Sequence, residues 1–184
     1  MNFRRVVIAT NDQGAAEVVV DGAPPRQHDF DNTPGFSQAL VWATPALPSL
    51  PSDGVDPTPA ATSFVPEVGG TRFILLTFPP DSVYADSSFD GAAAGAEAMQ
   101  HSPGIAELFE PDSPGMHTTP TVDYDIVLDG EIWLELSDGQ EVKLGAGDVV
   151  VPHGARHAWR NKSDRAATIA AILIGGDTTN RKVG

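Results

Sequence analysis

The feature that most constrains the fold is a rhythm of short strand-forming runs that begins at Thr121 and continues almost to the C-terminus. Turn-forming Gly, Asp, Asn or Pro residues close each run, at a spacing of roughly 8–12 residues. The runs read VDYDIVLDG, EIWLELSDG, QEVKLGAG, DVVVPHG, ARHAWRNKSD and RAATIAAILIGG. No long helical pattern separates them, so neighbouring strands must be antiparallel. We predict an all-β fold, best described as an antiparallel jelly roll or double-stranded β-helix barrel.

Residues 1–80 are expected to add N-terminal strands and a proline-rich loop. The strand-forming runs here are RRVVIA, AEVVVDG, SQALVWA and TRFILLTF. Six of the 16 prolines fall in residues 44–70, which excludes a helix interior or a central strand there. With the later runs, the expected total is about ten strands.

Residues 86–110 change in character, because Ala, Glu, Met and Leu dominate and Pro103 divides the segment. The pattern predicts two short helices, the second being GIAELFE. They either cover one end of the barrel or form a lid over a pocket. The lid interpretation makes four side chains candidate pocket lining: Met99, His101, Leu108 and Phe109.

The chain length of 184 residues suits one domain with a substantial core. We predict a single domain over residues 1–184. It would comprise the N-terminal strands and loop (1–80), the helical cover (86–110) and the barrel core (115–175).

The composition limits the possible partners. A formal net charge of −14 repels phosphate backbones, so nucleic acid is a poor candidate. No apolar run approaches the ~20 residues of a membrane span, and no signal sequence is evident, so we expect a cytoplasmic protein without membrane contact. The sequence has no cysteine, so any metal must be bound by His and carboxylate side chains.

Strand periodicity places three of these possible ligands on inward faces. Residues of equal parity share one face of a regular strand, so His117 and Asp123 can both point inward. His157 lies on a later strand, after the turn at His153 and Gly154. The three side chains meet only if the sheet closes.

The stretch PHGARHAWRN resembles the second sequence motif of the cupin superfamily. It carries the motif's residues at the family spacing: Pro152, Gly154, His157 and Asn161. The chain is therefore identified as similar to small single-domain cupins of the RmlC-like jelly-roll type, firmly over about 50 residues.

The first cupin motif is matched with departures. Gly130 anchors its register, which puts His117 at the first histidine and Asp123 at the glutamate position. Thr119 stands where the family has a second histidine. The resemblance thus implies a reduced ligand set of His117, Asp123 and His157, and the same three residues as the catalytic group.

Two imidazoles and one carboxylate form a set suited to non-haem Fe(II) and acceptable to Zn, Mn, Co or Ni. We therefore expect a divalent metal cofactor, with Fe(II) favoured and with Thr119 bonding a metal-bound water. The alternative is a barrel that has lost its metal, in which His117 and Asp123 form a buried pair.

Four side chains are candidates for the substrate pocket: Thr119, Trp159, His101 and Arg156. Trp159 could stack on a planar substrate, and His101 could act as an acid or base. Arg156 could pair with a substrate carboxylate.

The expected function is that of a metal-dependent enzyme acting on a small organic molecule, with an aromatic or carbonyl-bearing substrate in view. Dioxygenase chemistry is slightly favoured, since three protein ligands leave positions for substrate and O2. A non-redox lyase, dehydratase, decarboxylase or isomerase remains open, as does a non-catalytic small-molecule-binding cupin. The resemblance further implies a homodimer paired through the N-terminal strands.

Overall fold

A computed structural model of the chain describes residues 3–179. Its strands are, in chain order, β1 (Arg5–Thr10), β2 (Ala16–Gly22), β3 (Arg26–Asp29), β4 (Ser37–Thr44), β5 (Thr71–Phe78), β6 (Thr121–Asp129), β7 (Glu131–Leu136), β8 (Glu141–Gly145), β9 (Val149–Val150), β10 (His157–Arg160) and β11 (Ala167–Gly175). One α-helix, α1 (Gly91–His101), and two 3-10 turns, η1 (Asp81–Val83) and η2 (Ala106–Leu108), lie between β5 and β6.

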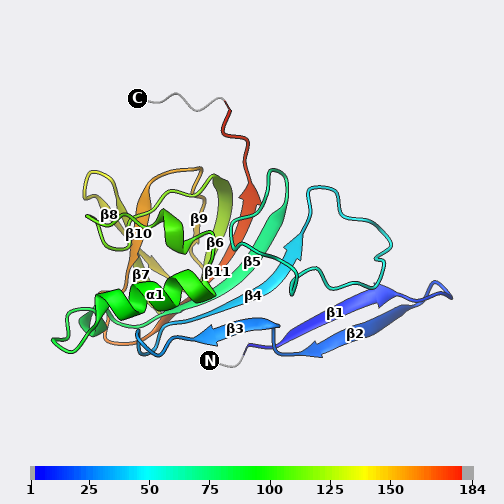
Figure 1. The fold of residues 1–184 in the computed structure, drawn as a ribbon, viewed down its shortest axis with the longest axis horizontal. Helices are drawn as coiled ribbons and strands as arrows, with labels where there is room; N and C mark the ends of the chain where they lie inside the picture. The colour runs from blue at the N-terminus through cyan, green and yellow to red at the C-terminus, as the bar shows by residue number, and fades with distance from the viewer. Residues whose placement is uncertain (1–2, 180–184) are drawn as a thin grey trace.

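The strands form three antiparallel sheets (Figure 1). The largest has six strands in the order β3-β4-β5-β11-β6-β9, the second has three in the order β10-β7-β8, and β1 and β2 form a separate hairpin. The six- and three-stranded sheets enclose one core cluster, which includes Val127, Ile132 and Ile169. This packing creates the interior in which the candidate site lies.

Strand β11 is the central element of the large sheet. It pairs with β5 along one edge and with β6 along the other. Its run ATIAAILIG is almost wholly apolar and largely buried, as expected for a strand covered on both faces. Strand β6 instead alternates, with Thr121, Asp123, Asp125 and Val127 buried. Its odd-numbered residues therefore face the interior, as the strand periodicity predicts.

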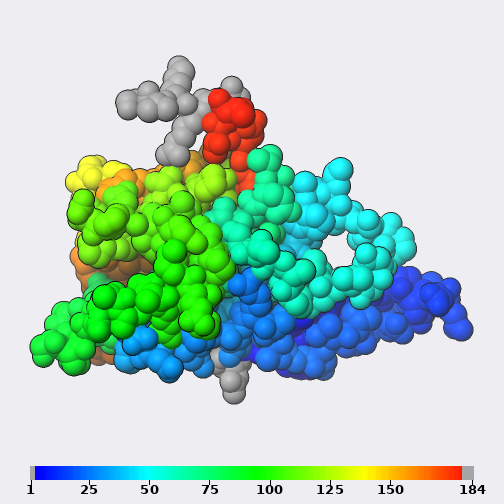
Figure 2. Space-filling view, in the orientation of Figure 1, coloured from blue at the N-terminus to red at the C-terminus, as the bar shows by residue number. Residues whose placement is uncertain are grey.

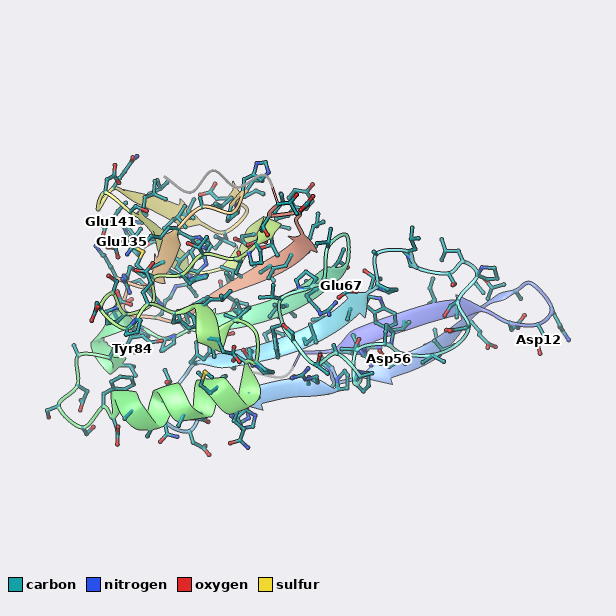
Figure 3. All side chains as sticks on the ribbon, turned by 45° about the horizontal axis from the view of Figure 1, so that its top comes forward. Asp12, Asp56, Glu67, Tyr84, Glu135 and Glu141 are labelled. Atoms are coloured by element: carbon teal, nitrogen blue, oxygen red, sulfur yellow. The ribbon has the colours of Figure 1, made fainter. Side chains whose placement is uncertain are left out.

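The β1–β2 hairpin extends away from the rest of the molecule, and Figure 3 shows Asp12 at its tip. Arg5 anchors its base: the guanidinium donates to the Val41 carbonyl at 3.0 Å, pairs with Asp56, and lies 5.6 Å from the Trp42 ring centroid. Asp56 belongs to the proline-rich loop that runs beside the hairpin (Figures 2 and 3). The loop prediction for residues 44–70 agrees with this placement.

The broad fold prediction is confirmed, because the chain is mostly β and its sheets are antiparallel. Three details differ. Strand pairing does not close the sheets into one barrel within residues 3–179. The strands number eleven, and the unpredicted β3 (RQHD) lacks β-branched residues and forms by pairing with β4.

The third difference concerns the second covering helix, which is only the 3-10 turn η2. Gly104 has a φ of +88°, and Pro111 and Pro114 follow the turn, so no uninterrupted helical stretch is available there. None of the helices in residues 3–179 has the length and apolarity needed to span a bilayer.

Gly130, between β6 and β7, gives a direct test of the sheet packing. Its φ is +81°, and an added Cβ would lie 2.7 Å from the Ala166 carbonyl oxygen and the Ala167 Cα. Gly139 has a similar φ of +78° but open space at its Cβ. We expect Gly139→Ala to cost about 1 kcal/mol of unfolding free energy through backbone strain, and Gly130→Ala roughly 3 kcal/mol or more. Denaturant unfolding measures both, and equal losses would contradict the close packing at Gly130.

Candidate functional site

A cavity of about 530 Å³ lies within the described part of the chain. Its walls come from the six-stranded sheet, from β10, from α1 and from the segment around residues 109–117. The volume is in the range that binds small organic ligands. Most of the lining is apolar, and its polar side chains include His117, Thr119, Asp123, Asp125 and His157.

His117 and His157 are held together by the backbone. Each residue's N–H donates to the other's carbonyl at 3.0 Å, which makes an antiparallel bridge between the segment before β6 and strand β10. Directly opposed residues in such a pair project their side chains on the same side. The two imidazole centroids are accordingly 4.5 Å apart.

Both imidazoles have one nitrogen turned to the backbone. The Nδ1 of His117 lies 3.1 Å from the Gly115 carbonyl oxygen, and the Nδ1 of His157 lies 2.8 Å from that of Ala155. An Nδ1–H that donates to a carbonyl leaves the Nε2 lone pair available as a base or a metal ligand. This is the tautomer that metal-binding histidines use most often.

Burial and the neighbouring His157 lower the pKa of His117 to about 4, against opposing effects of the Gly115 carbonyl and Glu110. The imidazole of His117 is therefore neutral near pH 7. A neutral ring can accept a proton or a metal ion.

Asp123 enters the cavity from β6 and is 4% exposed. Its Oδ2 accepts a long hydrogen bond of 3.5 Å from the Thr119 hydroxyl, and its Oδ1 is buried without a partner. Burial raises the pKa of this carboxyl, opposed by the Thr121 and Thr119 hydroxyls and by His157. A buried oxygen without a partner is costly unless a ligand meets it.

Asp125 lies two residues further along the same face and also lines the cavity. Burial raises its pKa to about 8, and the charge of Asp123 contributes. Residue parity puts Asp125 on the same face as Asp123, but it was not among the candidate site residues. An aspartate in a β-run usually faces solvent, and its burial follows from the covering of β6 by the second sheet.

The types of side chain present suit a divalent ion, since two imidazoles can present Nε2 and a buried carboxylate oxygen lacks a partner. Within residues 3–179, however, no three His, Cys, Asp or Glu side chains are gathered closely enough to hold a metal ion. The two imidazoles are already paired, and Asp123 lines the same cavity. The three-residue metal centre stays a prediction.

The four predicted pocket residues separate into two groups. Thr119 and Trp159 line the cavity. Arg156 is instead bound to Glu110, with its Nε and Nη2 at 2.7 and 2.6 Å from the two carboxylate oxygens. The ring of His101 is stacked on that of His28, with centroids 3.5 Å apart, and neither Arg156 nor His101 is among the lining residues.

The covering segment contributes a different face from the one expected. Of its four candidate lining residues, Phe109 lies in the cavity wall, whereas Met99 is 49% exposed. Helix α1 faces the cavity with four small residues: Gly91, Ala94, Gly95 and Ala98. These residues lie 3, 4 and 7 positions after Gly91, which is the spacing of one helix face. Because all four are small, the sequence analysis did not identify that face as a cavity wall.

Comparison with known proteins agrees with the motifs. Residues 107–174 match the sequence profile of the family described as "Cupin domain". The matched stretch includes His117, Asp123 and His157, and the resemblance of residues 115–161 to the two cupin motifs is confirmed.

Two curated relatives belong to fungal biosynthesis clusters. The chain is 51% identical over 51 residues to "Phomopsin biosynthesis cluster protein C'" of Diaporthe leptostromiformis, covering 28% of this chain and 27% of that protein. It is 35% identical over 79 residues to "Oryzines biosynthesis cluster protein J" of Aspergillus oryzae, covering 39% of this chain and 44% of that protein. The matches thus span less than half the length of these relatives.

Solved cupin structures are similar only at a low level. A Cupin 2 conserved barrel domain protein from Salinispora arenicola is 20% identical, with a TM-score of 0.34 over 56% of this chain and 62% of that chain.

One set of hydrogen bonds fixes α1 against the six-stranded sheet, and we call it the Glu97 latch. The Glu97 carboxylate accepts from the backbone N–H groups of Asp31 and Asn32 at 2.8 Å, and from the Asn32 amide at 2.9 Å. The Nε2 of His28 lies 2.8 Å from the same carboxylate. The latch ties α1 to β3 and to the turn before β4.

The latch predicts an acid-dependent loss of stability. Burial would raise the pKa of Glu97, but its hydrogen bonds with Asn32, His28 and Asp31 lower it from 4.5 to about 2. A carboxyl with a lowered folded-state pKa stabilises the protein above pH 4.5, and this stabilisation is lost as the pH falls toward 2. Its side chain is 8% exposed, so we expect Glu97→Gln to cost on the order of 3 kcal/mol at pH 7.

Denaturant unfolding of wild type and Glu97→Gln across pH 2–7 measures this effect. The gap between the two should close as the solution is acidified. Glu107→Gln is the matched control, because Glu107 lies in the same segment and accepts one bond, from the Gly104 N–H. A gap that stays constant down to pH 2 would mean that the Glu97 carboxylate charge does not hold the helix.

Proposed function

We propose that this protein is an enzyme that transforms a small organic molecule in the cavity of its cupin domain, with His117, Asp123 and His157 as the catalytic group. The observation that carries the proposal is the polar part of the cavity lining. Two paired imidazoles and a buried, unpartnered carboxylate oxygen line a ligand-sized space. Such concentrations of polar groups in an apolar cavity are typical of active sites.

The cofactor in this proposal is a divalent metal ion, with Fe(II) favoured over Zn, Mn, Ni or Co. The two imidazoles would be its first ligands and Asp123 its third, with the Thr119 hydroxyl beside them. When bound, the ion would supply Lewis-acid chemistry or, as Fe(II), reaction with O2. The protein's own part is to exclude water with its apolar walls and to orient the substrate against the catalytic group.

The dioxygenase form is the first candidate on ligand grounds, since two His and one carboxylate suit non-haem Fe(II). A non-redox lyase or isomerase is the second, and Asp125 favours it. Its carboxyl lines the same cavity, so the interior holds a second acid or base next to the catalytic group. A jelly roll, with the six- and three-stranded sheets as its two faces, is part of the same proposal.

Metal content is the first test of this function. We expect purified wild-type protein to carry about one divalent ion per chain, and His157→Ala to carry roughly a tenth of that or less, because a ligand is lost. His153→Ala is the matched control, since His153 lies in the exposed turn before β10. Elemental analysis of the three proteins measures this. Equal metal content in wild type and His157→Ala, or no metal in wild type, would overturn the metal-dependent form.

We also propose that two copies pair through the β1–β2 hairpin. Ile8 and Val18 are opposite partners in the hairpin and are 67% and 59% exposed, and an isolated two-stranded ribbon is marginally stable alone. Light scattering at about 10 μM should give twice the chain mass of 19.3 kDa, and Ile8→Lys should give the single-chain mass. Leu128→Lys, at another exposed apolar position, is the control. A monomeric wild type would refute the pairing.

A further inference from the structure

We infer that one face of α1, formed by Gly91, Ala94, Gly95 and Ala98, sets the size of the substrate, and that the substrate is an uncharged, ring-bearing apolar molecule. We call these four residues the small face of α1. The inference rests on the proposed function, because it takes the cavity as the substrate site.

The small face is not explained by packing within the protein. Glycine in a helix interior is unfavourable, by about 1 kcal/mol relative to alanine, yet α1 contains Gly95 in its middle. An added Cβ at Gly95 would meet nothing within 4 Å. The glycine therefore leaves space on the side that lines the cavity, rather than allowing a close helix contact.

A second observation indicates that the space holds a ligand. The Oδ1 of Asp123 is buried without a partner, its side chain is 4% exposed, and it lines the same cavity. The small face and Asp123 are parts of the same cavity lining. A ligand that reaches Asp123, directly or through a bound ion, has to occupy the cavity that the small face borders.

The wall is held in place, so the space is a size limit rather than a flexible opening. Asp90 caps α1, accepting from the Ala92 and Ala93 N–H groups at 3.0 Å. The Glu97 latch fixes the middle of the helix. Beyond its end, the Ser102 hydroxyl donates to Gln38 on β4 at 2.8 Å.

The charges of the lining disfavour an anionic substrate. Among the described lining residues, Arg160 is the one Arg or Lys side chain, and its Nε donates to Glu135 at 2.6 Å. Arg156 is bound to Glu110 and does not line the cavity. Four carboxyl groups do line it: Asp81, Glu110, Asp123 and Asp125. No described lining side chain offers a substrate carboxylate or phosphate a free positive charge.

The aromatic rings in the cavity lining indicate that the substrate bears a ring. Phe30, Phe36 and Phe78 form a chain of edge-to-face contacts, with centroid distances of 4.8 and 5.5 Å, and all three line the cavity. Trp159 and Phe109 lie in the wall near the two imidazoles. Rings in this arrangement bind flat apolar molecules by stacking and edge contacts.

The test uses two fluorescent probes with the same ring skeleton. N-phenyl-1-naphthylamine is uncharged, and 8-anilinonaphthalene-1-sulfonate adds a sulfonate. We expect wild-type protein to bind the uncharged probe on the order of tenfold more tightly. Equal or tighter binding of the sulfonate, or no binding of either probe, would overturn the inference.

The size limit on the substrate is tested by leucine substitutions on the small face of α1 and, as a control, on its other side. Gly95→Leu combined with Ala98→Leu fills the small face, and should weaken binding of the uncharged probe on the order of tenfold or more. Naphthalene, which is smaller, should lose about threefold or less. The control, Ala96→Leu with Gln100→Leu, lies on the exposed face and should bind as wild type does.

The single variant Gly95→Leu guards against a folding defect, because leucine favours a helix over glycine and has open space at this position. Its circular dichroism and melting should match or exceed wild type while its probe affinity falls. Unchanged affinity in both small-face variants would overturn the size limit. Metal content separates this failure from failure of the proposed function, because it depends on His157 and not on α1.

Discussion

The candidate site depends on one pair of backbone hydrogen bonds, those between His117 and His157. The two residues are 40 positions apart, yet each accepts from and donates to the other at 3.0 Å. An antiparallel bridge of this kind forces the two side chains onto the same side. The imidazole pair therefore follows from strand pairing and does not require side-chain packing to bring the rings together.

The remaining parts of the site are added by neighbouring elements. Strand β6 alternates buried polar and exposed residues, so it brings Asp123 and Asp125 into the cavity, and β11 supports β6 from the other edge. Helix α1 forms a wall through the Glu97 latch although none of its own residues is fully buried. The buried polar side chains and the small residues of the wall thus come from different segments of the chain.

The sequence predicted the parts of the fold that depend on local pattern. Turn spacing gave the strands from Thr121 onward, and parity gave the buried face of β6. It could not predict contacts set by tertiary packing. Arg156 was a candidate for a substrate carboxylate because no local pattern reveals its pairing with Glu110, and His101 was a candidate acid or base because its stacking on His28 joins distant segments.

Anomalous diffraction from crystals grown with Co(II) tests the central claim most directly. The account predicts one strong peak in the cavity, about 2.0–2.3 Å from the Nε2 atoms of both His117 and His157, with an oxygen of Asp123 as the next protein atom. Two results would contradict it: imidazoles of His117 and His157 that point apart, or a cobalt peak elsewhere and no cobalt peak between the two imidazoles.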